Sequence, residues 1–179
     1  MKTKEEIMQI SFELFKEKGY DNVSIDSICQ ICQINKTIFY KLIESKEYIL
    51  KYHFQLLYEQ IMKITQEHEK NIELLYIILM YPIKQNMKLG PELYAKYIIR
   101  HLHGQTLSAH FKEPIKILGI QLIEQAQKDG LIKNQSDSEH LFNVCRNITG
   151  SYAILWCTKR GNFDLVEKCE TSLKHILSY

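Results

Sequence analysis

The sequence predicts an all-α protein of about nine helices. Apolar residues recur at spacings of three and four along most of the chain, which is the period of an amphipathic helix. Ser, Thr, Asn or Asp precedes most of these stretches, as helix N-caps do. Apolar and polar residues alternate over no more than four positions, so no strand is expected.

Composition narrows the class of protein. The chain has 179 residues, 45% of them apolar and 25% charged, and a net charge of +2, as in ordinary globular proteins of one or two domains. The sequence has no run of 18 apolar residues, so no membrane span is expected. The acidic start MKTKEEIMQI does not fit a secretory signal. Five cysteines, an odd number without scaffold spacing, favour reduced thiols and a cytoplasmic location.

The first 67 residues contain four capped helical patterns. Thr3 and Glu6 form a capping box before a helix over 4–18, which Gly19 ends. Ser24 and Asn35 cap two helices of about two turns, over 25–32 and 36–43, and Ser45 caps a longer one that reaches about Glu67. Two short helices joined by a tight turn, packed on a third, are typical of a helix-turn-helix.

Residues 7–50 resemble the N-terminal domain of TetR-type transcriptional regulators. The most specific part is Phe39-Tyr40 followed by Ser45-Lys46-Glu47. The other matching residues are Ile7, Phe12, Leu14, Phe15, Gly19, Val23, Ser24, Ile25, Ile28, Ile34, Asn35, Lys36 and Leu50. The family usually has Gly at Gln33, a small residue at Thr37, His at Leu42 and Phe at Ile43. The resemblance implies a DNA-binding domain over 1–47 and a helical effector-binding and dimerisation domain over 48–179.

The helix over 36–43 is expected to read DNA. Asn35, Lys36 and Thr37 lie at its start, where they reach base edges, and Lys41 lies on the same face as Thr37. Ser24, Tyr40 and Lys46 match family positions that hold the phosphate backbone. The candidate DNA-binding residues are therefore Ser24, Asn35, Lys36, Thr37, Tyr40, Lys41 and Lys46. Taken singly, each of them is also an ordinary cap or surface residue.

Five further helices are expected after residue 67. The first covers 72–81, which Asn71 caps and Pro82 stops or kinks, and the next two cover 92–103 and 111–128. The fourth runs from a capping box at Ser136 and Glu139 to about Lys159, and the fifth from a cap at Asn162 or Asp164 to Leu177. The last two are apolar on wide faces, which favours a homodimer formed through them. An ordinary core within one chain is the alternative for some of these residues. The apolar positions are Leu141, Phe142, Cys145, Ile148, Tyr152, Leu155, Trp156, Phe163, Val166, Cys169, Leu173, Ile176 and Leu177.

Large or polar side chains on otherwise apolar helices are candidates for a small-ligand site. They are Tyr76, Met80, Tyr97, His101, Cys145, Arg146 and Thr149. Each of them singly is also an ordinary packing or surface residue. Arg146 needs a partner, either an acid or an anionic effector. The Cys29-x-x-Cys32 pattern lacks a second ligand pair for zinc, so core packing is the preferred interpretation. No metal site, cofactor or catalytic constellation is expected.

These observations and the resemblance predict a homodimeric, ligand-responsive transcriptional repressor. It would bind a palindromic double-stranded DNA operator and be released by a small-molecule effector, without a membrane partner. The alternative is a helical adaptor that keeps the fold and acts through protein partners, without an effector. An enzyme is not expected.

Overall fold

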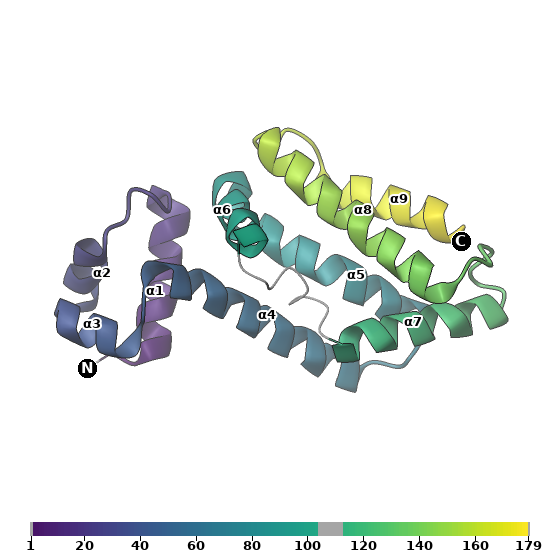
Figure 1. Ribbon diagram of the computed structural model, residues 1–179, viewed down its shortest axis with the longest axis horizontal. Helices are drawn as coiled ribbons and strands as arrows, with labels where there is room; N and C mark the ends of the chain where they lie inside the picture. Colours follow the sequence, from purple (N-terminus) through teal and green to yellow (C-terminus); the bar gives the residue numbers. More distant parts are fainter. Residues whose placement is uncertain (1, 104–112, 179) are drawn as a thin grey trace. The chain divides into compact units, whose positions relative to one another are not determined.

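The computed structural model describes residues 2–103 and 113–178, which form nine α-helices and no strand (Figure 1). The all-α prediction is confirmed for this part of the chain. The helices are α1 (Lys4–Lys18), α2 (Ile25–Cys32), α3 (Lys36–Leu42), α4 (Lys46–Glu67), α5 (Ile72–Met87), α6 (Gly90–His103), α7 (Glu113–Lys128), α8 (Ser138–Thr158) and α9 (Leu165–Leu177). None of these helices combines the length and the apolarity needed to cross a bilayer.

The chain divides into two compact units, Met1–Leu56 and Leu57–Tyr179. The division falls inside α4, so this helix contributes its first half to one unit and its second half to the other. The first unit otherwise contains α1 to α3, and the second contains α5 to α9.

The caps of the first unit follow the sequence closely. At the start of α1 the Glu6 N–H donates to Thr3 Oγ1 over 3.2 Å, and the Thr3 N–H donates to Glu6 Oε2 over 2.7 Å, so the predicted capping box is confirmed. Gly19 ends α1 with a φ of +82°, a conformation that glycine adopts without strain. Inside the unit the helices bury a shared apolar core, made of Ile7, Met8, Phe15, Ile28, Phe39, Ile43, Ile49 and Leu50.

The second unit is organised around α5 and α8. Helix α5 packs against α6, α7, α8 and α9, and α8 packs against α6, α7 and α9 (Figure 1). Pro82 does not stop the helix, which was one of its two predicted effects, because α5 continues through it to Met87. A proline in a helix loses one backbone hydrogen bond, but residues on both sides of Pro82 are buried, and their packing keeps the segment helical.

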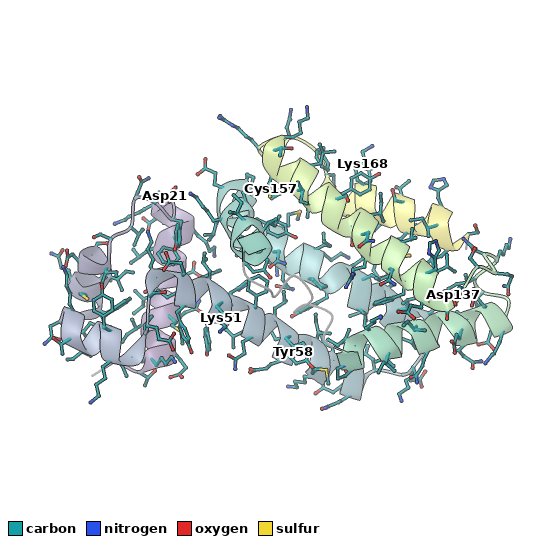
Figure 2. All side chains as sticks on the ribbon, viewed as in Figure 1. Asp21, Lys51, Tyr58, Asp137, Cys157 and Lys168 are labelled. Carbon is teal, nitrogen blue, oxygen red and sulfur yellow. The ribbon has the colours of Figure 1, made fainter. Side chains whose placement is uncertain are left out.

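Two further details of the second unit correct the sequence analysis. Helix α8 is capped by Asp137 (Figure 2), whose Oδ1 accepts from the His140 N–H over 2.7 Å, and Ser136 is not the cap. The Ser136 N–H instead donates to Asn134 Oδ1 over 3.1 Å, which places this serine in the preceding turn. The expected start of the helix over 111–128 lies partly outside the described residues, and α7 is described from Glu113.

Helices α7 and α8 pack closely at Gly119. A Cβ atom at this position would lie 2.2 Å from Cε2 of the buried Phe142 ring. That separation is far below van der Waals contact, so only glycine fits the crossing as it stands.

The last two helices bury most of their apolar residues within their own chain. An ordinary core within one chain, the alternative to a dimer contact, therefore accounts for several of the predicted positions: Leu141, Phe142, Cys145, Trp156, Leu173 and Leu177, among others. Packing against α5, α6 and α7 accounts for this burial. From the predicted set, Leu155 remains well exposed, at 44%.

Candidate nucleic-acid interface

Helix α3 presents a polar face to solvent. Asn35 caps it by accepting from the Ile38 N–H over 2.9 Å, as the sequence predicts. Phe39 and Ile43 are fully buried and fix which side of the helix faces the core. The opposite side exposes four of the predicted DNA-binding residues, Lys36, Thr37, Tyr40 and Lys41. Tyr40 is 52% exposed and its ring meets the edge of Phe39, so the phenol is held outward.

The turn before α3 is held by backbone hydrogen bonds. Gln33 adopts a left-handed φ of +57°, and the Ile34 N–H donates to the Cys29 carbonyl over 3.0 Å. This arrangement is a helix C-cap of the kind that usually contains glycine. A glutamine therefore occupies the strained position where the resembling family usually has glycine.

Ser24 lies exposed at the start of α2. Its hydroxyl accepts from the Ser27 N–H over 3.1 Å, and the Ser27 hydroxyl accepts from the Ser24 N–H over the same distance. The predicted cap is confirmed, with Ser27 as its reciprocal partner. The free N–H groups of a helix start favour an anion such as a phosphate.

Lys36 is paired with a residue that the sequence analysis did not single out. Its Nζ lies 2.8 Å from Oδ1 of Asp26 on α2, and both side chains are exposed, at 57% and 71%. The hydrogen bond with Asp26, followed by its charge, raises the pKa of Lys36. The two residues lie ten positions apart in the sequence, and no periodic pattern links them.

Lys46 points inward, toward its own unit. Its Nζ donates to the Tyr20 carbonyl and lies 4.0 Å from the Tyr20 ring centroid and 5.5 Å from that of Phe15. The Tyr20 hydroxyl donates to Glu47 Oε1 over 3.3 Å. The lysine thus ties the end of α1 to the start of α4, and its ammonium is engaged without DNA.

The candidate ligand residues do not converge on one described cavity. Met80, Tyr97, Cys145 and Thr149 are buried in the core of the second unit, and the Thr149 hydroxyl donates to the Arg146 carbonyl over 2.9 Å. Arg146 is half-buried, and the side chain of His101 lies outside the described residues.

Tyr76 belongs to a polar group between α5 and α9. Its hydroxyl bonds to Glu170, and Lys84 Nζ lies 3.3 Å from that hydroxyl and 3.4 Å from Glu170 Oε1. Beside it is a small, partly open hollow with room for about one water molecule. Its lining is apolar apart from the tyrosine, and consists of Ile72, Leu75, Tyr76, Leu79, Leu173 and Leu177.

The arrangement of helices matches three solved structures over nearly the whole chain. FadR of Thermus thermophilus, a TetR-family transcriptional repressor in complex with lauroyl-CoA, gives a TM-score of 0.64 at 18% identity, covering 97% of this chain and 93% of its own. PfmR, a TetR-family transcriptional regulator of the same organism, gives 0.52 at 19% identity, covering 96% and 97%. The chain has the fold of TetR-family regulators.

A third structure, of a probable transcriptional regulatory protein, shares this TetR fold with a TM-score of 0.53 at 15% identity, covering 98% of this chain and 97% of its own. No protein-family profile and no curated protein matches the sequence. The resemblance found in residues 7–50 thus extends to the fold of nearly the whole chain.

Within this TetR fold, Cys29 and Cys32 are packing residues of α2. Both thiols are free and buried, and burial is the main cause that raises the pKa of each. Among the described residues, no group of His, Cys, Asp and Glu is placed to hold a metal ion. The geometry agrees with core packing of both cysteines.

Iodoacetamide is therefore expected to modify all five thiols of the folded protein slowly. Burial raises the pKa of the half-buried Cys157 to about 11, so at pH 8 it holds about a hundredfold less thiolate than a thiol of pKa about 9. The rates are expected to rise with pH, and unfolding in guanidinium should expose every thiol. Mass spectrometry of peptides reports each site. Fast labelling of both Cys29 and Cys32 in the native protein would contradict their packing.

Proposed function

We propose that the protein is a homodimeric DNA-binding transcriptional regulator, most simply a repressor of a palindromic operator. The exposed polar face of α3 is the observation that carries this proposal. Lys36, Thr37, Tyr40 and Lys41 supply cationic, hydroxyl and methyl groups on one side of a short helix, which suits contacts with base edges and phosphates in the major groove. The TetR fold supports the same conclusion.

Each predicted DNA contact takes a defined role in this proposal. Lys36 and Thr37 face the bases, Lys41 faces the bases or the adjacent phosphates, and Tyr40 bonds to a phosphate. Ser24 and Asn35 act through the starts of α2 and α3, where backbone N–H groups favour phosphate. Lys46 acts mainly by fixing the start of α4, because its ammonium is engaged with Tyr20.

The proposed dimer forms through the outer face of α8. Ile154 and Leu155 are 48% and 44% exposed on this face. One turn earlier, a Cβ atom at Gly150 would meet nothing within 4 Å in its own chain, and Ser151 is exposed. Small residues followed by large apolar ones allow close approach of a second α8 in an isologous contact.

Regulation by a small-molecule effector is proposed for the second unit. FadR, which shares the fold, is in complex with lauroyl-CoA. An effector shifts the protein between two states only if it binds one of them more tightly. The alternative, an adaptor without effector, is favoured by the burial of Met80, Tyr97, Cys145 and Thr149 in the core.

Thermal unfolding with a series of acyl-CoA compounds separates these two proposals. A ligand at 100 times its Kd is expected to stabilise the folded protein by about 2.7 kcal/mol. Release of bound DNA by the same ligand would support the regulator. No stabilisation by any chain length would favour the adaptor over an acyl-CoA sensor.

DNA binding is tested with the double variant Tyr40→Phe, Lys41→Gln. Both side chains are exposed, so helix content is expected to stay unchanged. Affinity for duplex DNA should fall, and the slope of log K against log salt should become shallower by about 0.9 for each lysine lost. The matched control is Lys133→Gln, Lys159→Gln, which removes exposed charges from the second unit. Equal losses in both variants, or none, would contradict the proposed role of α3.

A further inference from the structure

The ion pair between Asp26 and Lys36 places an acid on the proposed DNA-reading face. We propose that Asp26 is a specificity-determining residue, which keeps Lys36 from binding phosphate and leaves it available to base edges. This inference rests on the proposed DNA-binding function. It adds a residue of α2 to the DNA-reading surface. The negative charge of this residue repels phosphates, whereas most contacts between protein and DNA are attractive.

The geometry shows how many hydrogen-bond donors of Lys36 remain for DNA. An ammonium has three N–H donors, and the 2.8 Å contact with Asp26 Oδ1 uses one of them. Two donors remain for acceptors on a base, such as O6 and N7 of guanine. A neutral base edge therefore binds Lys36 while the ion pair stays intact.

A phosphate meets a different situation at the same ammonium. It brings a negative charge close to the Asp26 carboxylate, so that two anions share one cation. Like charges at such separations repel, and the repulsion grows as DNA displaces water from the face. Phosphate binding by Lys36 thus requires repulsion from Asp26 or loss of the ion pair.

The consequence concerns discrimination more than affinity. Sequence-independent binding comes almost entirely from neutralised phosphates, while base contacts distinguish sequences. Asp26 weakens the binding of Lys36 to phosphates and leaves its contacts with bases unchanged. The ion pair itself is exposed, so it adds little to stability, and its removal leaves the fold intact.

The experiment compares Asp26→Asn with the wild-type protein on two probes. One is a random-sequence duplex of roughly 30 base pairs, long enough for two half-sites a turn apart. The other is the duplex of that length that the wild-type protein enriches most from a random pool. Asn keeps the size of the side chain and removes its charge.

Asp26→Asn is expected to strengthen binding to the random duplex by about five- to tenfold per bound subunit at 0.1 M salt, and to steepen the salt slope by about 0.9 per subunit. Binding to the enriched duplex should strengthen less, so the ratio of the two affinities falls. Glu13→Gln is the matched control, since it removes an exposed carboxylate from the 2.9 Å pair with Lys16 on α1. It should change neither slope nor ratio.

A double-mutant cycle with Lys36→Met tests whether the effect passes through the lysine. Removing Lys36 should reduce the salt slope more in the Asp26→Asn background than in the wild type. An unchanged slope and ratio in Asp26→Asn, with normal wild-type binding, would overturn the role of Asp26 alone. Absence of DNA binding by the wild type would instead overturn the proposed function itself.

Discussion

The double substitution Ile154→Glu, Leu155→Glu is expected to convert the protein from a dimer to a monomer. Both side chains lie exposed on the outer face of α8, and a two-fold contact there would bring four carboxylates together. Burying such charges without partners costs several kcal/mol. A loss of about 4 kcal/mol weakens the dimer roughly a thousandfold. Sedimentation velocity at micromolar concentration reports the change.

Helix content should remain as in the wild type, because the altered residues point away from the core of their own unit. Affinity for an enriched duplex should fall as the dimer is lost, since two reading heads no longer bind together. Ile117→Glu is the matched control, as Ile117 is 46% exposed on α7. A variant that stays dimeric, or a control that dissociates equally, would show that α8 is not the interface.

Gly119→Ala is expected to destabilise the second unit. The added Cβ would lie 2.2 Å from Cε2 of Phe142, with Cδ2 and Cζ at 2.8 and 2.9 Å. Overpacking of this kind costs about 3 kcal/mol, and the better helix propensity of alanine returns about 1 kcal/mol. The net loss of about 2 kcal/mol should lower Tm by roughly 4–8 °C.

Gly150→Ala provides the matched control for this prediction, with both glycine variants compared in the monomeric Ile154→Glu, Leu155→Glu background because Gly150 lies on the proposed dimer face. It is also a glycine-to-alanine change within a helix, but its Cβ meets nothing within 4 Å in the chain. The control should keep or raise Tm, because alanine adds up to about 1 kcal/mol to the stability of a helix. Combining Gly119→Ala with Phe142→Leu should cost less than the sum of the two single changes, because the smaller side chain frees space. Equal Tm values for both glycine variants would contradict the close crossing.

Short-range hydrogen bonds and helix periodicity explain why the helix starts and the exposed side of α3 could be predicted from the sequence. The caps at Thr3, Ser24 and Asn35 bond to N–H groups within three residues, so their signals lie in short stretches of sequence. The exposed side of α3 follows in the same way, because the buried Phe39 sets the helix orientation.

Features that depend on contacts between helices were not visible in the sequence. Asp26 reads as an ordinary acid in a first turn, and its contact with Lys36 arises only when α2 and α3 cross. Gly119 reads as a weak point in a helix, and its need for glycine comes from Phe142 on another helix. Periodicity also cannot tell whether an apolar face packs in its own chain or on a partner. That ambiguity explains why the apolar positions of α8 and α9 were open to both interpretations.

The central claim is that two copies of α3 in a symmetric dimer read one duplex. Selection of wild-type binding sites from a pool of random duplexes tests it most directly. The account predicts enrichment of a two-fold symmetric sequence whose half-sites have centres about 34–36 Å apart, or a multiple of one helical turn. A pool that remains random, or an enriched sequence without two-fold symmetry, would contradict the account.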